Sequence, residues 1–378
     1  MEKLTSVKLI NHACFSFEYK GESVLVDPWF KGAIFNNSWR LVDEGGDVPD
    51  NLKYIFITHE HPDHLHWPTL KALADKKITI CIPKRQNSNV KDNLKKLGYK
   101  VVEFYHGVKK KLKWLEAEYF NTGHDNAIVF KTKDLVMLNQ NDCYLQQHVC
   151  HNIINRYPHI DIWWMQFSLA GYYGNQDHVK ALQNAQKLHE NHYASYKEIF
   201  NPVISIPFAS FVYFCREENK ELNKYRVPLT TIYENNPGTQ VLYKGDEVMF
   251  GDSKSRSMKN ILKWESHFRE TLPMENPKGT VNELKSVITE FANKYGATGS
   301  ISFELYDSEK YCNIDFDRRE VDCEEPSNPI AKVTLFDLTE MFKNPWGADT
   351  MNITSCFKVY DEGRWKALLG SVDSLYVR

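Results

Sequence analysis

One short segment constrains this chain more than any other. Thr58 to Leu65 reads T-H-E-H-P-D-H-L, and its imidazole and carboxylate groups are ligand types that suit zinc, iron or manganese. The preceding run, Tyr54 to Thr58, is β-branched and aromatic, which predicts a buried strand. Pro62 prevents that strand from continuing, and the histidine spacing differs from the i, i+4 pair of a helical zinc site. We therefore expect metal ligands on a loop at a strand's carboxyl end, namely His59, His61, Asp63 and His64.

The alternative for this segment is a histidine-rich surface turn. An aspartate interleaved with three histidines is costly to hold together without a cation, and this favours the metal site.

The composition is that of an ordinary globular protein, with 42% hydrophobic and 25% charged residues among 378. A net charge of −2 gives no argument for binding nucleic acid or an anionic membrane. No apolar stretch approaches the length of a transmembrane span, and the first fifteen residues lack the apolar core of a signal peptide. The length predicts one large domain and a smaller one.

The eight cysteines are widely scattered, which predicts free thiols and a cytoplasmic location rather than a disulfide framework. No C-x-x-C or C-x-H pair occurs, so we expect neither a zinc ribbon nor a Rieske cluster within this chain.

Strand-like and helix-like segments alternate through the first 250 residues, which predicts an α/β layered fold. The expected strands are 6–10, 14–19, 23–26, 54–58, 78–82, 101–104, 114–120, 127–131, 135–139, 160–165 and 203–206. One helix is expected to begin at Pro68, and two others are expected over 89–97 and 177–196. Beyond residue 250 a helical period at 281–291 precedes alternating strands at 299–306 and 311–316. We therefore predict a metal-binding domain over 1–250 and a small α+β domain over 251–378.

Four ligands on one loop cannot enclose a metal, so further ligands must come from elsewhere in the chain. Two candidates stand at expected strand ends. His124 lies in the polar turn 121–126, and Asp142 follows the apolar strand 135–138.

The order of these residues resembles the metallo-β-lactamase superfamily, whose members carry H-x-H-x-D-H after a strand, then a distant histidine, then an aspartate after another strand. The resemblance implies an αββα sandwich, extended here by the smaller α+β unit. It also implies a ligand set. By this resemblance one metal is bound by His59, His61 and His124, a second by Asp63 and His64, and both by the bridging Asp142.

A wider likeness extends over about residues 7–230. Asn11-His12-Ala13-Cys14, Asp27-Pro28-Trp29 and Asp142-Cys143 resemble the cytidine monophosphate-N-acetylneuraminate hydroxylase branch. Two features depart from the pattern. The Rieske domain of that branch is not expected in this chain, and Pro207-Phe208-Ala209 stands where the superfamily carries P-x-H after its last core strand. The second metal then keeps Asp63, His64 and Asp142.

Several other residues are candidates near this site. His106 is a rival to His124, and one of His148, His151 and His159 could replace the missing histidine. His12 is expected either to contact substrate or to be a buried, hydrogen-bonded histidine. Asp27 is expected to orient the metal loop by hydrogen bonding, and Trp29 to line a pocket.

Three functions are compatible with these residues. The leading hypothesis is a hydrolase that uses water activated by one or two divalent ions (zinc, iron or manganese) on an ester or phosphodiester of a small molecule, with Asp63 and His64 as catalytic residues. The family resemblance implies an alternative, a non-haem iron oxygenase acting on a nucleotide-sugar-like substrate and supplied by a separate electron-transfer protein. The third is a non-catalytic, metal-stabilised binding protein. The sequence leaves the oligomeric state open.

Overall fold

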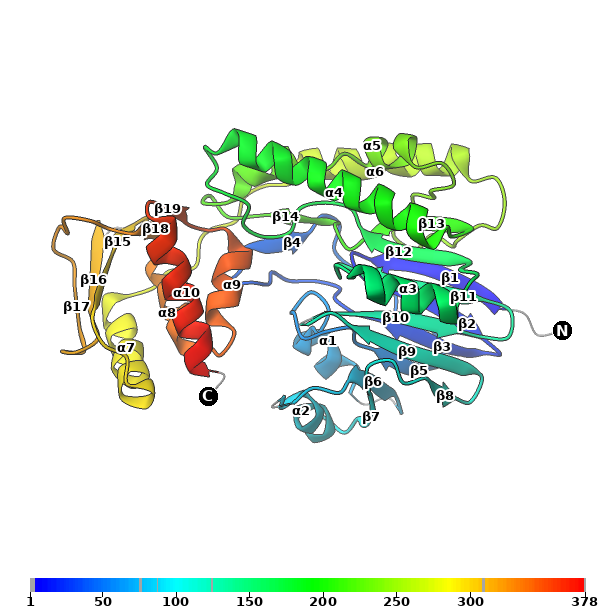
Figure 1. The fold of residues 1–378 in the computed structure, drawn as a ribbon, viewed down its shortest axis with the longest axis horizontal. Helices are drawn as coiled ribbons and strands as arrows, with labels where there is room; N and C mark the ends of the chain where they lie inside the picture. The colour runs from blue at the N-terminus through cyan, green and yellow to red at the C-terminus, as the bar shows by residue number, and fades with distance from the viewer. Residues whose placement is uncertain (1–3, 75–76, 87, 124, 308–309, 377–378) are drawn as a thin grey trace.

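Two six-stranded sheets form the centre of the molecule. The computed structural model describes residues 4–74, 77–86, 88–123, 125–307 and 310–376 (Figure 1). In spatial order the first sheet contains β1 (Leu4–Asn11), β2 (Cys14–Tyr19), β3 (Glu22–Val26), β5 (Leu52–Phe56), β6 (Thr79–Pro83) and β7 (Lys100–Phe104). The second contains β13 (Ile204–Phe208), β12 (Ile162–Gln166), β11 (Val136–Asn141), β10 (Asn126–Lys131), β9 (Leu115–Asn121) and β8 (Lys110–Leu112).

Helices cover the outer faces of both sheets. The first sheet packs against α1 (Trp67–Ala72) and α2 (Val90–Lys96), whose buried leucines Leu70 and Leu94 join a cluster with Ile55 and Ile80. The second sheet lies against α3 (Gln147–Arg156) and the long α4 (Val179–Phe200), in which Tyr193 contacts Trp163 (Figure 1). This arrangement confirms the predicted αββα sandwich.

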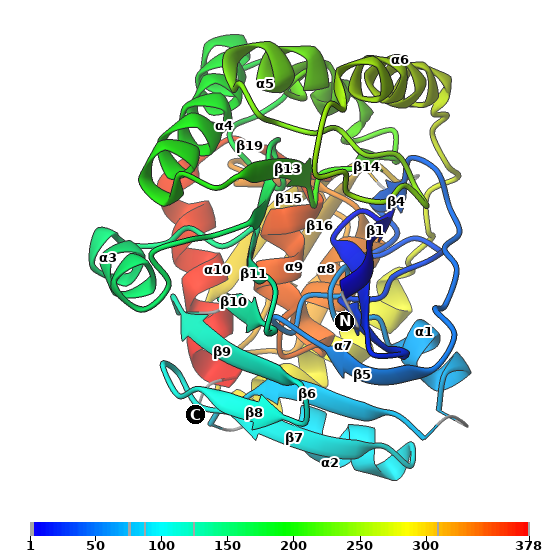
Figure 2. The same ribbon diagram turned by 90° about the vertical axis from the view of Figure 1, so that its right-hand side faces the viewer.

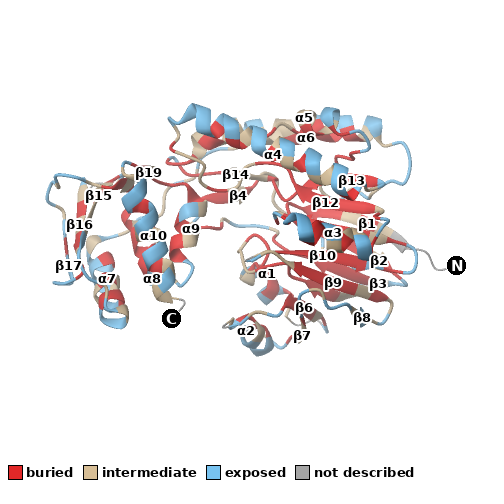
Figure 3. Cartoon of the chain, viewed as in Figure 1, coloured by how far each residue is buried: buried red, intermediate tan, exposed pale blue. Residues whose placement is uncertain are grey.

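Aromatic side chains fill the space between the two sheets. Phe15 of β2 stacks on Trp164 of β12 with ring centroids 4.6 Å apart, and Phe56 of β5 meets Phe130 of β10 edge-on at 4.9 Å. All four are buried. The strands of the two sheets are largely coloured as buried in Figure 3. Burial of a side chain this large stabilises the fold by about 1.5–3 kcal/mol, so these residues fix the spacing of the sheets.

The C-terminal unit has a hydrophobic core of its own. Its five-stranded sheet is ordered β17-β16-β15-β18-β19 and carries helices on one side (Figure 2). Its elements are α7 (Val281–Tyr295), β15 (Ser300–Leu305), β16 (Tyr311–Asp315), β17 (Glu320–Asp322), β18 (Ala331–Val333), α8 (Leu335–Lys343), α9 (Gly347–Thr354), β19 (Lys358–Val359) and α10 (Glu362–Tyr376). The unit is the smaller α+β extension that the sequence predicts.

The change from one core to the other falls later than residue 250. The helix α6 (Lys254–Glu270) packs on the sandwich, because Trp264 stacks on Phe211 at 4.1 Å and belongs to the first core. The second core begins at Leu284 in α7. The clusters therefore assign α6 to the first core and α7 to the second, while the predicted domain boundary at residue 250 stays a prediction.

Shorter elements lie where the sandwich meets the C-terminal unit. They are β4 (Trp39–Leu41), which pairs with β14 (Val212–Phe214), and the 3-10 helix η1 (Lys220–Tyr225), and Ile353 of α9 packs against their hydrophobic cluster. The helix α5 (Leu229–Asn235) instead packs on the first core through Leu229 and Ile232. After β14, the fully buried Arg216 pairs with Asp337 of α8 at 2.9 Å and with Glu218 at 3.3 Å. Asn36 Nδ2 also donates to Asp337, at 3.1 Å. These contacts fix α8 against the sandwich.

All eight cysteines are free, as predicted. Among the described helices, none is both long and apolar enough to cross a membrane.

Candidate metal centre

The candidate ligands meet because of the strand directions. Since β3, β5 and β6 are parallel, their carboxyl ends lie at one edge of the first sheet. The loop after β5 carries the histidine motif, and the loop after β3 carries Asp27. His12 comes from the β1–β2 turn, Asp125 from the β9–β10 turn, and Asp142 from the end of β11.

Local backbone geometry at these ends is unusual. His12, Asp27 and Asn141 all have positive φ, at 35°, 43° and 47°. Such a residue costs about 1–3 kcal/mol and persists where its surroundings fix it, often at functional sites. The Asn141 Oδ1 atom accepts the Asp142 backbone N–H at 2.6 Å, so the residue before this candidate ligand helps to set its direction.

The first group of ligands surrounds His59. His59 Nε2 lies 2.9 Å from His61 Nδ1 and 3.7 Å from Asp125 Oδ1. The three side chains place one ligand atom each within 4.8 Å of one another. Asp125 was absent from the predicted ligands, although it follows the predicted His124 directly in the sequence.

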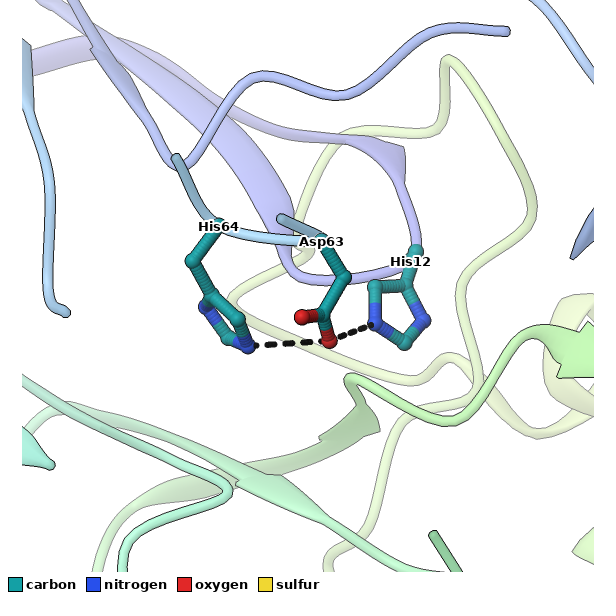
Figure 4. Close-up of side chains that lie close together, drawn as sticks. All are labelled: His12, Asp63 and His64. Atoms are coloured by element: carbon teal, nitrogen blue, oxygen red, sulfur yellow. Dashed lines mark hydrogen bonds and ion pairs between the residues drawn. The ribbon is translucent and has the colours of Figure 1, made fainter. Parts of the chain in front are cut away.

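The second group surrounds Asp63. Its Oδ2 atom lies 3.2 Å from His64 Nε2 and 3.2 Å from His12 Nε2 (Figure 4). These three residues also have ligand atoms within 4.8 Å of one another, and all are buried.

Asp142 connects the two groups. Its Oδ2 atom is 3.6 Å from His59 Nε2 and 3.4 Å from His64 Nε2. One carboxylate oxygen thus faces an imidazole of each group, in the position predicted for a bridging ligand.

Buried atoms without hydrogen bonds show that the cluster fits a cation. Within the described part of the chain, five such atoms belong to it: His12 Nδ1, Asp63 Oδ1, His64 Nε2, Asp125 Oδ1 and Asp142 Oδ1. The ion-pair contacts of His64 Nε2 lack hydrogen-bond geometry. An unsatisfied buried polar atom costs about 1–3 kcal/mol, and a metal ion would satisfy several of them together.

The pKa shifts of His59 and Asp125 are compatible with a bound cation. Burial and the nearby His64 hold the pKa of His59 well below its usual range, so the imidazole is neutral, as a metal ligand must be. Burial and the charge of Asp142 raise the pKa of Asp125 to about 6. A cation would relieve this crowding of carboxylates.

Asp27 lies where a carboxylate can orient His64. Its Oδ2 atom is 2.8 Å from His64 Nδ1 and accepts the Thr58 hydroxyl at 2.7 Å, while Oδ1 accepts the Thr58 backbone N–H at 2.8 Å. His64 Nε2 is thereby left facing Asp63 and Asp142. Pairs of this kind fix the tautomer of a metal-ligating histidine, which is the role predicted for Asp27.

A carboxylate from the C-terminal unit has the same relation to His61. Asp349, in the first turn of α9, places Oδ2 3.3 Å from His61 Nε2. Burial lowers the pKa of His61, but the hydrogen bond of Asp349 and the charges of Asp63, Asp349 and Asp142 together raise it above its usual value. No sequence signal pointed to Asp349, because a single aspartate in a helical first turn is common.

His12 lies in the cluster itself. Its Nε2 atom faces Asp63, and its ring meets Trp29 edge-on with centroids 5.6 Å apart. The His12 carbonyl accepts the backbone N–H of Ala209 at 2.9 Å. Ala209 belongs to Pro207-Phe208-Ala209, the segment that lacks the histidine expected from the superfamily. This segment therefore holds the turn that carries His12.

The remaining candidates lie apart from both groups or cannot be placed. His124 lies outside the described residues. His106 Nδ1 accepts the backbone N–H of Asn121 at 2.8 Å in an exposed turn. His159 pairs with Asp161 at 3.0 Å. None of these described histidines, nor His148 or His151, belongs to a metal-sized group.

A cavity of about 200 Å³ adjoins the first group. His59 and His61 line it together with Phe35, Trp67, Arg85, and Trp346 of the C-terminal unit. A small molecule in this cavity would therefore lie against the candidate ligands.

Comparison with known proteins agrees with this fold. Residues 6–161 match the family model for the beta-lactamase superfamily domain. The match lies within the sandwich and supports the predicted placement of this region in the metallo-β-lactamase superfamily.

Two curated relatives and one solved structure show the range of similar proteins. The chain is 25% identical over 226 residues to the cytidine monophosphate-N-acetylneuraminic acid hydroxylase of Danio rerio, covering 53% of this chain and 37% of that protein. It is 25% identical over 183 residues to a protein of Mycobacterium tuberculosis named as a Rieske 2Fe-2S iron-sulfur protein, covering 44% of this chain and 35% of the relative. The matches span about a third of these relatives.

A possible metal-dependent hydrolase from Veillonella parvula is similar in structure, with a TM-score of 0.46 and 13% identity over 65% of this chain and 99% of that one. A likeness this distant carries no functional information.

Proposed function

We propose that the protein is a hydrolase that uses one or two divalent transition-metal ions, zinc, iron or manganese, to activate water against an ester or phosphodiester of a small molecule. The observation that carries this proposal is Asp142. Its Oδ2 atom lies within 3.6 Å of an imidazole from each group, and its Oδ1 atom has no hydrogen-bond partner among the described residues.

The residues that would hold the ions follow from the two groups. His59, His61 and Asp125 would bind the first, and the family resemblance adds the predicted His124. Asp63, His64 and His12 would bind the second, and Asp142 would reach both. When bound, a divalent ion lowers the pKa of water from 15.7 to about 7 and stabilises an oxyanion as a Lewis acid.

The chain's own groups supply positioning and proton transfer. Asp63 is buried and its Oδ1 atom has no hydrogen-bond partner among the described residues, so this oxygen can orient a water molecule and accept its proton. His64, held by Asp27 through Nδ1, would present Nε2 to the ion beside Asp63. Phe35, Trp67 and Trp346 restrict water around a substrate in the cavity.

A second candidate is a non-haem iron oxygenase. Two metal-sized groups, His59–His64–Asp142 and His12–His64–Asp63, each contain two histidines and one carboxylate, which is an arrangement used by oxygen-activating iron sites. The likeness to a hydroxylase and to a Rieske protein favours this candidate. It requires a separate electron-transfer protein, and by analogy with the hydroxylase its substrate would be nucleotide-sugar-like.

The two candidates are separated by assaying one preparation for two reactions. Protein purified without oxygen is analysed for metals, then tested for hydrolysis of bis(p-nitrophenyl) phosphate and for dioxygen uptake with a reductant. We expect zinc or manganese with phosphodiester turnover, and loss of turnover in Asp142→Asn. Iron with reductant-dependent dioxygen uptake would contradict hydrolysis and support the oxygenase. Bound metal without either reaction would support a non-catalytic binding protein. A cytoplasmic location stays a prediction.

A further inference from the structure

Arg85 stands beside the metal centre and has no role in holding it. It lies two residues beyond the end of β6, so the parallel sheet places it at the same edge as the histidine loop after β5. Its side chain lines the 200 Å³ cavity with His59 and His61. It also lines a larger cleft of about 950 Å³ that continues outward past Trp346 and Tyr376 of the C-terminal unit.

The guanidinium of Arg85 offers two unused hydrogen-bond donors. Its Nε and Nη2 atoms are buried, and neither has a partner among the described residues. The nearby Glu60, which lines the same cavity, instead accepts the hydroxyl of Ser88 at 2.7 Å. A buried charged donor without a partner is costly, so a site that keeps one is built to bind an acceptor from outside.

Two other arginines show how this chain satisfies such groups when they are structural. Arg40 uses Nε and Nη2 together to bind Glu44, at 3.1 and 2.5 Å. The buried Arg216 pairs with Asp337 and Glu218. The Nε–Nη2 edge of a guanidinium presents two parallel N–H groups that match the two oxygens of a carboxylate or phosphate. At Arg85 this edge has no hydrogen-bond partner within the part of the chain that the structure describes.

We propose that Arg85 binds the anionic group of the substrate, a carboxylate or a phosphate, through its Nε and Nη2 atoms. The inference rests on the proposed function for the identity of the cavity as the active site, and it adds the substrate's charge and the residue that selects it. With the anion on Arg85, the rest of the molecule extends along the cavity toward His59 and His61, between Trp67 and Trp346. Both tryptophans line the cavity and the outer cleft.

The test measures anion binding rather than turnover. Benzoate, phenylphosphonate and the neutral benzamide are titrated calorimetrically into metal-loaded and metal-depleted protein. Arg85→Gln is compared with the wild type and with Lys84→Gln. Lys84 is a matched control, because it is the neighbouring cation, lines only the outer cleft and already pairs with Glu103 at 3.0 Å.

We expect Arg85→Gln to weaken binding of benzoate or phenylphosphonate by about tenfold to a hundredfold in both metal states. Lys84→Gln should leave the affinity for these anions within about twofold of the wild-type value. The affinity for benzamide should be the same for wild type and both variants. The tighter-bound anion identifies carboxylate or phosphate as the preferred group. Equal affinity of Arg85→Gln and wild type, or absence of anion binding by wild type, would overturn the proposal.

A thermal melt separates a binding role from a structural one. Because Nε and Nη2 make no described hydrogen bond, the Tm of Arg85→Gln should equal or exceed that of wild type. A Tm lowered by several degrees would overturn the proposal, since Arg85 would then stabilise the fold. Absence of hydrolysis or of bound metal would contradict the proposed function alone, because the Arg85 comparison is also made without metal.

Discussion

Two buried clusters of charge in this molecule differ in how they are satisfied. Around Arg216, the guanidinium meets Asp337 and Glu218, and Asn36 and Thr334 supply further hydrogen bonds. Around Asp142, carboxylates and imidazoles converge with His59 and His64 buried and Asp142 partly exposed, yet five of their atoms have no hydrogen-bond partner within the described residues.

The comparison distinguishes a structural cluster from a functional one. Both clusters pay the desolvation cost of buried charge. The Arg216 cluster offsets this cost internally and joins the C-terminal unit to the sandwich. The Asp142 cluster leaves ligand atoms available at the edge of a cavity, which is the condition for binding a metal ion.

The largest expected effect concerns the unsatisfied cluster. His59→Ala should remove nearly all bound metal, because His59 lies in the first group and also faces Asp142. The free energy of unfolding of the metal-free protein should change by no more than about 1 kcal/mol, since an unsatisfied site is being emptied. Metal analysis and urea unfolding measure the two quantities, with His106→Ala as the control. Full metal content in His59→Ala would show that the ligand assignment is wrong.

The Arg216 cluster, whose charges are paired, should respond to substitution with a loss of stability. Arg216→Met leaves Asp337 and Glu218 buried without their counterion, which should lower the free energy of unfolding by about 3–5 kcal/mol. Arg318→Met is the control, because Arg318 is 77% exposed and lies 3.9 Å from Asp315, and it should cost less than about 1 kcal/mol. Urea unfolding measures both variants. If the two variants lost equal free energy of unfolding, the buried Arg216 pairs would not differ in stability from the exposed Arg318 pair.

A smaller effect on metal affinity is expected for Asp27, whose carboxylate orients the candidate ligand His64. Asp27→Asn keeps the shape of the side chain but no longer accepts hydrogen bonds through both oxygens, so His64 loses its fixed tautomer. Metal affinity should fall by about 10- to 100-fold, measured by competition with a chelator. Unchanged affinity would mean that Asp27 serves only to hold Thr58.

The smallest effect tests whether the C-terminal unit takes part in the site. Asp349→Asn should lower metal affinity by about tenfold, at the lower end of the range for such partners, because Asp349 is more exposed than Asp27. Asp361, which directly precedes α10 and belongs to none of the metal-sized groups, provides the control Asp361→Asn. Identical affinities for the two variants would show that α9 contributes no positioning to His61.

The sequence predicted the parts of this site that depend on local signals. Strand-forming runs before His59 and Asp142 placed both residues at strand ends, and Asp27 was expected to support the motif loop. The sandwich and the α+β extension were predicted as well. The sequence did not predict the places of Asp349 and Arg85 at the site, or the position of His12 opposite Asp63. Each depends on packing between segments far apart in the chain. The assignment of α6 to the first core was likewise beyond the sequence, since it depends on the contact of Trp264 with Phe211.

The central claim is that the converging loops bind a transition metal, and metal analysis of the wild-type protein tests it most directly. Protein purified without chelators, and the same protein after exchange into zinc, iron or manganese and removal of free ions, is measured by plasma mass spectrometry. We predict one or two equivalents of a transition metal per chain. Folded protein that retains none of these ions under either condition would contradict the account.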